Sequence, residues 1–123
     1  MKLDLENKIA LVTGGGRDIG KLISLNLASE KAIVAVNYNS SSKEAEETVA
    51  DIRKLGGNAK AYKGDISNYH EMKNTIEQIN VDFGEIDILV NNAGYTRIER
   101  FIESTPKEWD KQIDICLKGS INC

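Results

Sequence analysis

Residues 8–20 read Lys-Ile-Ala-Leu-Val-Thr-Gly-Gly-Gly-Arg-Asp-Ile-Gly, an apolar run followed by a glycine cluster. The apolar run predicts a buried strand over Lys8–Thr13, and the segment after the glycines predicts a helix from Asp18 to Glu30. The expected apolar positions of this helix are Ile19, Ile23, Leu25 and Leu27. Glycines at a strand-to-helix turn let the backbone approach a phosphate, whose charge the helix N-terminus stabilises. The stretch therefore predicts a nucleotide-binding turn, and a flexible turn without a ligand is the alternative.

The rest of the chain repeats this alternation of short β-branched runs and longer amphipathic segments. Further strands are expected over Ala32–Tyr38, Ala59–Lys63 and Ile86–Val90, and further helices over Ser42–Leu55, Asn68–Phe83 and from Thr105 onward. The apolar stripes of the second and third helices are expected to be Ala45, Val49, Ile52 and Leu55, and Met72, Ile76 and Ile79. Because each strand-helix unit takes about 30 residues, right-handed crossovers are expected. The pattern predicts an α/β fold of the Rossmann type, three layers around a parallel sheet of order 3-2-1-4, in incomplete form.

Composition limits the classes of protein that the chain can be. It has 123 residues, a formal net charge of −3, 41% hydrophobic and 28% charged residues, which are values typical of one globular domain and not of disorder or coiled coil. With no basic cluster, no uninterrupted apolar segment and no signal-like N-terminus, we expect no nucleic-acid or membrane partner and a cytoplasmic protein. The two cysteines, Cys116 and Cys123, and one histidine indicate neither a disulfide framework nor a zinc site.

Two further motifs follow the predicted third and fourth strands. They are Gly64-Asp65-Ile66 and Asn91-Asn92-Ala93-Gly94. Together with Thr13-Gly14-Gly15-Gly16-Arg17-Asp18-Ile19-Gly20, they make the sequence resemble the short-chain dehydrogenase/reductase family over essentially its whole length. The resemblance implies an oxidoreductase that uses a nicotinamide dinucleotide.

The resemblance also implies roles for individual residues. Gly14, Ile19 and Gly20 are expected at the pyrophosphate, and Asn91, Ala93 and Gly94 at the adenosine ribose. Asp65, with Ile66 beside it, is expected to accept a hydrogen bond from the adenine amino group. The alternative role for Asp65 is to cap the helix that begins near Asn68.

The end of the second predicted strand indicates which dinucleotide is preferred. An acid about 20 residues after the glycine turn would bind the ribose 2′-hydroxyl of NAD, but no acid follows this strand before Glu44. Arg17 stands where members of the family that prefer NADP often carry a basic residue, and Asn37, Asn39 and Ser40 can donate hydrogen bonds. We therefore expect NADP(H) rather than NAD(H).

The sequence departs from the family pattern at two positions. Asp18 stands where the family has its second motif glycine, so that its carboxylate either weakens or reshapes cofactor binding near Arg17, or caps the helix and points to solvent. Cys116 stands where the family has an asparagine of a proton relay. A thiol is a weak donor and acceptor, so we do not assign it the relay role and expect a buried structural cysteine instead.

No catalytic residue is assigned to this chain. The family's serine and its Tyr-x-x-x-Lys pair lie well beyond Asn-Asn-Ala-Gly, and 123 residues end before them. Tyr69 and Lys73 have the Tyr-x-x-x-Lys spacing, but they fall in the third predicted helix, so we do not take them as catalytic. His70 is expected to be a solvated helix residue, and Trp109 a packing residue of the last helix.

These observations predict an NADP-binding Rossmann domain over residues 1–123, truncated within a helix, as the cofactor-binding part of an oxidoreductase. The complete protein is expected to transfer hydride between NADP(H) and a small-molecule carbonyl or secondary alcohol, with 3-oxoacyl thioesters as the substrate suggested by resemblance. It is expected to form a homodimer or homotetramer, and this chain alone to be inactive. A non-catalytic nucleotide-binding or regulatory module and one half of a split enzyme are the alternatives. We also expect Ile113, Leu117 and Ile121 to form an apolar stripe without its normal partners, which favours marginal stability or association.

Overall fold

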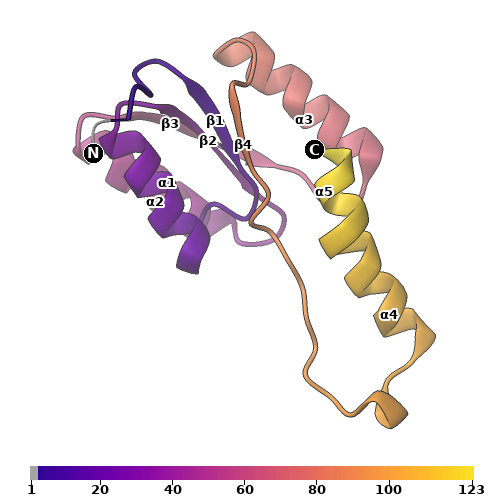
Figure 1. Cartoon of the computed structure of the whole chain (residues 1–123). Helices are drawn as coiled ribbons and strands as arrows, with labels where there is room; N and C mark the ends of the chain where they lie inside the picture. Colours follow the sequence, from indigo (N-terminus) through magenta and orange to yellow (C-terminus); the bar gives the residue numbers. More distant parts are fainter. Residues whose placement is uncertain (1–2) are drawn as a thin grey trace.

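The computed structural model describes residues 3–123, which form a parallel four-stranded sheet flanked by helices (Figure 1). The strand order is β3-β2-β1-β4, as the sequence predicts. The strands are β1 (Ile9–Val12), β2 (Ile33–Tyr38), β3 (Asn58–Lys63) and β4 (Ile88–Val90). The helices between them are α1 (Asp18–Ser29), α2 (Ser42–Lys54) and α3 (Tyr69–Asp82). Helices α1 and α2 cover one face of the sheet. Helix α3 lies on the other face, together with the C-terminal helical segment, residues 106–122 (Figure 1).

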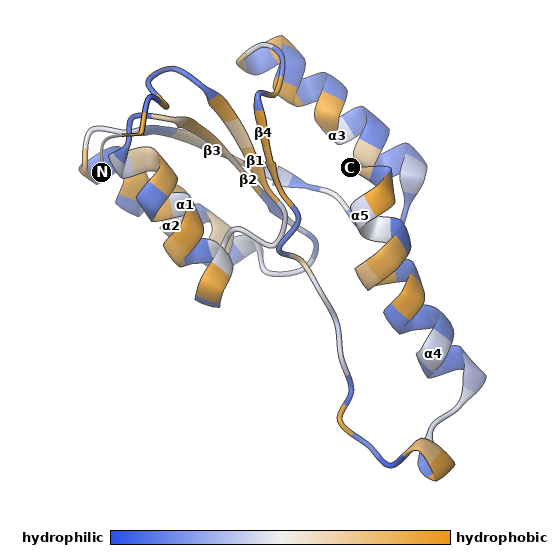
Figure 2. Cartoon of the chain, viewed as in Figure 1, coloured by the Kyte–Doolittle hydropathy of each residue, from blue (hydrophilic) through white to orange (hydrophobic). Residues whose placement is uncertain are grey.

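The core lies on both faces of the sheet because alternate strand residues point to opposite sides. One cluster comprises Val12, Val34, Val36, Ala45, Val49, Ile52 and Ala59. The other comprises Ile9, Leu11, Ala35, Tyr62 and Ile79. Figure 2 shows the corresponding apolar colour along the strands. Full burial of each valine or leucine side chain contributes about 1.5–3 kcal/mol, so these clusters hold the sheet and helices together.

Two residues of the expected apolar stripes do not join the core. Ile19 is 69% exposed and Leu55 is 77% exposed, so their predicted inward positions are wrong. Ile19 lies in the first turn of α1, and Leu55 follows the last residue of α2, where the helix ends in a glycine turn. The Gly57 amide donates to the Ile52 carbonyl, and Gly56 adopts a φ of +83°, as expected for a helix that glycine terminates.

The fourth strand begins at Ile88 and not at Ile86, because the Asp87 side chain replaces a backbone group in the pairing with β1. Its side-chain Oδ2 accepts a hydrogen bond from the Ile9 amide at 2.9 Å, while its own amide donates to the Ile9 carbonyl. Regular pairing with β1 starts one residue later, with Ala10 opposite Ile88. The other strand and helix ends differ from the predicted ones by one residue or coincide with them.

The segment after β4, for which the sequence predicted only a helix from Thr105 onward, lies largely apart from the sheet (Figure 1). It runs extended away from the sheet to a short 3-10 turn, η1 (Phe101–Glu103), and returns as α4 (Pro106–Ile113), a π-helical turn η2 (Asp114–Lys118) and α5 (Gly119–Asn122) (Figure 1). The predicted N-cap is confirmed, because the Thr105 side chain accepts a hydrogen bond from the Glu108 amide and Pro106 opens the helix. Trp109 stacks on Phe101 with ring centroids 5.3 Å apart, but it is 39% exposed, so it packs only against this neighbour and not into a core.

The C-terminal helical segment leaves apolar residues exposed. Ile113, Leu117 and Ile121 are 47%, 57% and 74% exposed, and Leu89 on β4 is 39% exposed. Figure 2 shows these apolar stretches along α4 to α5. Within residues 3–123, no helix has the length and apolar character needed to cross a membrane.

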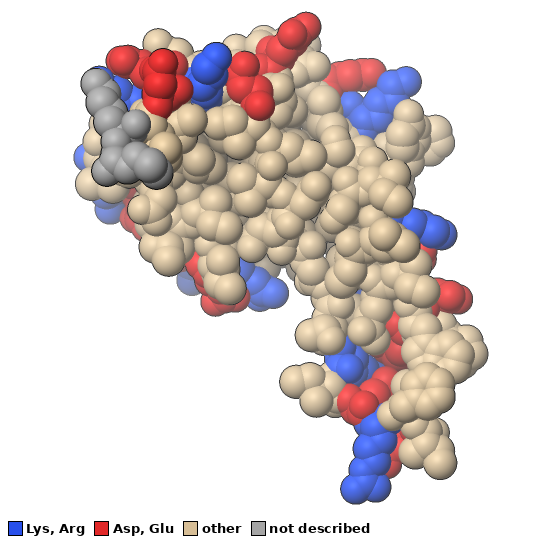
Figure 3. All heavy atoms as spheres, viewed as in Figure 1, with Lys and Arg blue, Asp and Glu red and all other residues tan. Residues whose placement is uncertain are grey.

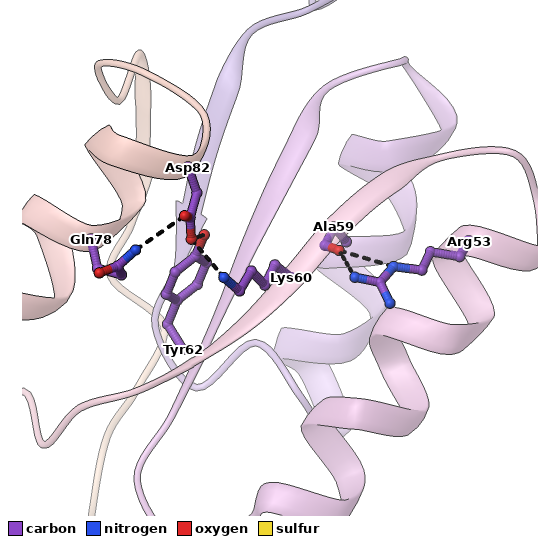
Figure 4. A network of polar contacts seen from close by, with 6 residues as sticks. All are labelled: Arg53, Ala59, Lys60, Tyr62, Gln78 and Asp82. Carbon is purple, nitrogen blue, oxygen red and sulfur yellow. Dashed lines mark hydrogen bonds and ion pairs between the residues drawn. The ribbon is translucent and has the colours of Figure 1, made fainter.

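A polar network fastens the far edge of the sheet to α3 (Figure 4). The Asp82 carboxylate accepts hydrogen bonds from Lys60 at 2.7 Å, from the Tyr62 hydroxyl at 2.8 Å and from Gln78 at 3.0 Å. Lys60 and Tyr62, followed by Gln78, hold the pKa of Asp82 below its usual range, although partial burial opposes them. Burial and the nearby Asp82 raise the pKa of Tyr62. The network thus joins a charged edge strand to the helix that covers it.

We predict that Asp82→Asn lowers the thermal midpoint at neutral pH by removing the charged acceptor. A carboxyl whose pKa is lowered by folding stabilises the fold above its unfolded pKa, near 4, and this contribution is lost as the pH falls through the lowered value. Thermal unfolding of both proteins from pH 7 downward should therefore show a gap that closes in acid. Glu77→Gln, an exposed carboxylate on the same helix, is the control and should leave the midpoint unchanged. A gap of the same size at every pH would contradict the prediction.

Candidate functional site

A cavity of about 500 Å³ lies at the carboxyl ends of the strands. Its walls come from the glycine turn and the first turn of α1, the end of β2 and the residues after it, the residues after β3 and β4, and two residues of the C-terminal helical segment. Parallel sheets with this strand order bind ligands at this edge, where strand order reverses. The cavity is therefore the candidate site.

All but one of the sequence-predicted site residues line this cavity. They are Gly14, Arg17, Asp18, Ile19, Gly20, Asn37, Asn39, Ser40, Asp65, Ile66, Ala93 and Gly94. Asn91 is exposed and does not line the cavity. Sequence reasoning did not select eight lining residues, namely Gly16, Tyr38, Ser41, Gly64, Asn92, Tyr95, Lys111 and Ile115. Gly16, Gly64 and Asn92 lie inside motifs already recognised, whereas no motif pointed to Tyr95, Lys111 or Ile115.

The glycine turn and the segment after β4 are joined by a hydrogen-bonded tie. The Thr13 hydroxyl donates to the Val90 carbonyl at 3.3 Å and accepts from the amides of Asn92 and Ala93 at 3.1 and 3.0 Å. The Asn92 side-chain amide donates to the carbonyls of Thr13 and Gly14 at 3.1 and 3.2 Å. Asn92 thus holds the glycine turn in place, a role that differs from binding a ligand.

The close approach of backbone segments explains two of the glycines. Gly14 has a φ of +59°, in the left-handed region that glycine adopts without strain. A Cβ at Gly20 would collide with the Gly14 carbonyl oxygen and lie 2.7 Å from Asn92 Nδ2. The first turn of α1 therefore packs directly on the backbone of the glycine turn.

The first turn of α1 offers donors to the cavity. Arg17 occupies the N-cap position without a side-chain capping bond. The amides of Asp18, Ile19 and Gly20 precede the first helical hydrogen bond, which Lys21 donates to Arg17. Such amides, together with the positive end of the helix, attract a phosphate. The residues present thus fit an extended phosphate-bearing ligand.

Asp18 has a strained backbone and an exposed carboxylate. Its φ is +51°, a left-handed value that aspartate tolerates better than most residues but glycine adopts freely. Its side chain is 86% exposed and lies 3.8 Å from Arg17, which is an ion pair at the cavity rim. It is the first helical residue, and Arg17 holds the N-cap position, so the predicted helix-capping role is not seen. The prediction that the carboxylate points to solvent agrees with this exposure.

The structure corrects the predicted role of Asn37. This side chain is 2% exposed, and its amide donates to the carbonyls of Gly64 and Tyr62 at 3.0 and 3.4 Å. Its two donors are therefore used to hold β2 against β3 and are not free for a ligand. Asn39 and Ser40, which follow, are exposed.

Asn68 takes the helix-capping role that the sequence left open for Asp65. Asn68 caps α3, because its side chain accepts from the Glu71 amide. Asp65 instead accepts from the Ser67 amide and hydroxyl at 2.9 and 2.7 Å, both through Oδ1. Within residues 3–123, no hydrogen bond reaches its Oδ2, which leaves an acceptor at the cavity wall.

Cys116 is exposed, so the prediction of a buried cysteine is wrong. Cys116 lies in the π-helical turn. Its Sγ accepts a hydrogen bond from the Tyr95 amide at 3.5 Å and donates one to the Tyr95 carbonyl at 3.2 Å. The thiol therefore closes on the backbone of the segment after β4. Tyr69 and His70 are exposed on α3, and neither lines the cavity.

Comparisons with known proteins agree on one family. Residues 8–123 match the family model described as short chain dehydrogenase. The chain is 43% identical over 117 residues, 95% of its length, to 3-oxoacyl-[acyl-carrier-protein] reductase FabG of Staphylococcus epidermidis, of which the match covers 48%. It is 53% identical over 95 residues, 77% of its length, to the short-chain dehydrogenase/reductase homolog YusS of Bacillus subtilis, of which the match covers 87%.

Solved structures show the same likeness. A short-chain dehydrogenase of Burkholderia cenocepacia in complex with NADP superposes with a TM-score of 0.92 at 36% identity. The match covers 98% of this chain and 49% of that one. A Serratia marcescens short-chain dehydrogenase/reductase mutant gives the same TM-score at 32% identity. The chain thus spans about half the length of FabG and of these structures.

We predict that Gly20→Ala is not tolerated, because its methyl group would collide with the backbone of Gly14. The cost of such overpacking is about 1–3 kcal/mol or more, which should appear as a lower midpoint in thermal or urea unfolding. Gly94→Ala is the matched control at the same cavity, since its Cβ would meet only Cys116 Sγ at 3.9 Å. Equal stability of the two variants would show that the collision is absent.

Proposed function

Because the chain belongs to the short-chain dehydrogenase family, we propose that its cavity binds NADP(H). The complete protein would then transfer hydride between NADP(H) and a carbonyl or secondary alcohol, with this chain carrying the cofactor-binding part. The observation that carries the proposal is the uncapped first turn of α1, which opens into a cavity at the carboxyl edge of the sheet. The 43% identity to FabG supports a 3-oxoacyl thioester as the substrate class.

The rim of the cavity favours a 2′-phosphate over a free ribose hydroxyl. Arg17 is exposed at this rim, and Asn39 and Ser40 line the same cavity. No acid follows β2 before Glu44, so nothing at this point repels a phosphate. The Burkholderia structure that resembles this chain contains NADP, which supports the same choice.

The residues of this chain would bind and orient the dinucleotide. The first-turn amides, including those of Ile19 and Gly20, would hold the pyrophosphate, and Asp65 Oδ2 would accept from the adenine amino group. Ala93 and Gly94, with Asn91 beside them, would face the ribose. When bound, the cofactor supplies the hydride.

Proton transfer is not assigned to any residue of this chain. The thiol of Cys116, at the family's asparagine position, is engaged with the backbone of Tyr95. That engagement leaves it poorly suited to hold a relay water, because a thiol is a weak donor and acceptor. We propose that the chain by itself has no significant turnover.

A second function, a nucleotide-binding module or one part of a two-chain enzyme, is favoured by two observations. The match to YusS covers 87% of that relative, so the likeness is not confined to relatives twice as long. Leu89 at the edge strand and Leu117 on the C-terminal helical segment are exposed apolar residues that a second chain would cover. This alternative keeps the proposed cofactor site and differs in where the remaining catalytic groups lie.

We predict that NADPH binds the chain more tightly than NADH and that Arg17→Gln removes most of the difference. The reason is the loss of a cation beside the 2′-phosphate, which should weaken NADPH binding about fivefold or more and leave NADH nearly unchanged. Titration by cofactor fluorescence or calorimetry measures this, with Lys43→Gln, a cation on α2 outside the cavity lining, as the control. Tighter binding of NADH by the native chain would overturn the NADP proposal.

We also predict that the purified chain does not oxidise NADPH in the presence of an acetoacetyl thioester. Absorbance of NADPH over time is the measurement, and a FabG-type reductase under the same conditions is the positive control. Turnover by the chain alone would refute the proposal that the catalytic residues lie outside this chain. Turnover that arises only after adding a second polypeptide would favour the two-chain alternative.

A further inference from the structure

Lys111 on α4 is a second cation at the cavity, and it belongs to none of the motifs. Two acids, Asp18 and Asp65, and two bases, Arg17 and Lys111, line the cavity. Arg17 already lies beside the carboxylate of Asp18 at 3.8 Å. Across residues 3–123, Lys111 has no carboxylate within ion-pair distance, so its charge is available to a ligand.

The Lys111 ammonium is held in place by an aromatic ring. Its Nζ lies 4.0 Å from the centroid of the Tyr95 ring, a cation–π distance. The Tyr95 hydroxyl donates to Glu108 Oε2 at 3.0 Å, and both backbone polar groups of Tyr95 bond to Cys116. The ring is thus fixed at its backbone and at its tip, which limits the positions of the ammonium above it.

Glu108, the acid that bonds to the Tyr95 hydroxyl, is already paired with another cation, Arg97. Arg97 lies 3.5 Å from Glu108 Oε1 and 3.3 Å from Glu99 Oε2. The side chains of Glu108 and Glu99 are 19% and 15% exposed, so this pairing is partly shielded from water. Figure 3 shows acidic and basic side chains adjoining one another on the projection formed by the segment after β4 and α4. Glu108 therefore positions Tyr95 and does not need Lys111 as its partner.

We propose that Lys111, held over the Tyr95 ring, is a phosphate-binding residue of this cavity that offsets the negative charge of Asp18. The inference rests on the proposed function, since it assumes that a dinucleotide occupies the cavity. Without Lys111, Asp18 and Asp65 would outnumber the single base Arg17, and a ligand with several phosphate charges would be repelled. The phosphate it binds is either the 2′-phosphate or the pyrophosphate.

The test compares Lys111→Gln with Lys107→Gln, a change of an exposed lysine on the same helix that does not line the cavity. Dissociation constants for NADPH, NADH, 2′,5′-ADP and ADP are measured at low and high ionic strength. Lys111→Gln should weaken binding about fivefold at low ionic strength and less at high, because salt screens an exposed charge. Lys107→Gln should leave binding unchanged, and Lys111→Arg should retain most of the affinity.

The four ligands identify the phosphate. A loss confined to NADPH and 2′,5′-ADP assigns Lys111 to the 2′-phosphate. An equal loss with NADPH, NADH and ADP, and a smaller one with 2′,5′-ADP, which has no pyrophosphate, assigns it to the pyrophosphate. Tyr95→Leu should weaken the same ligands, because it removes the ring that positions the ammonium, and a thermal midpoint for each variant verifies folding. Unchanged affinity of Lys111→Gln for all four ligands, while the native chain binds NADPH, overturns this inference alone. A native chain that binds neither dinucleotide refutes the proposed function and this inference together.

Discussion

The hydroxyl of Thr13 is the point on which the geometry of the cavity depends. Thr13 is 1% exposed, and its hydroxyl donates to the Val90 carbonyl and accepts from the amides of Asn92 and Ala93. These hydrogen bonds are partly buried, where leaving a polar group unpaired is costly. The Asn92 side chain in turn donates to the carbonyls of Thr13 and Gly14. The ends of β1 and β4 are therefore fixed relative to each other. The first turn of α1 can then pack on this platform and present its amides to the cavity.

Charge at the cavity is arranged differently from the family pattern that the sequence resembles. A glycine at position 18 would adopt the observed left-handed φ without strain and without charge, whereas Asp18 brings a carboxylate next to Arg17. Aspartate is among the residues that tolerate this conformation, which explains how the turn keeps its shape. At the rim, however, the Asp18 carboxylate pairs with Arg17 and so competes with a ligand phosphate for its charge. Cys116 is the second departure from the family pattern. Its thiol, in place of an asparagine, bonds to backbone groups of the segment after β4.

The sequence predicted the parts of the fold that depend on local pattern and on the handedness of crossovers. Strand order follows from spacing and from right-handed connections, and the glycine turn and the cap at Thr105 are local features. The side-chain partners could not be predicted in the same way. The predicted strand order places β3 beside β2, but it does not show that the Asn37 side chain bonds to carbonyls of the neighbouring segment. Tyr95 and Lys111 meet across a bend of the chain, so their shared wall of the cavity depends on tertiary packing.

The bond from Thr13 to Val90 also determines when the cavity can form during folding. These residues are 77 apart in sequence, so the contact closes a long loop, and the length-dependent part of its entropic cost is about 4 kcal/mol. The pairs β1 with β2 and β2 with β3 require much shorter closures and can assemble earlier. The cavity has no complete wall until β4 joins β1. A nucleotide in this cavity would therefore stabilise the sheet most strongly once β4 has joined it.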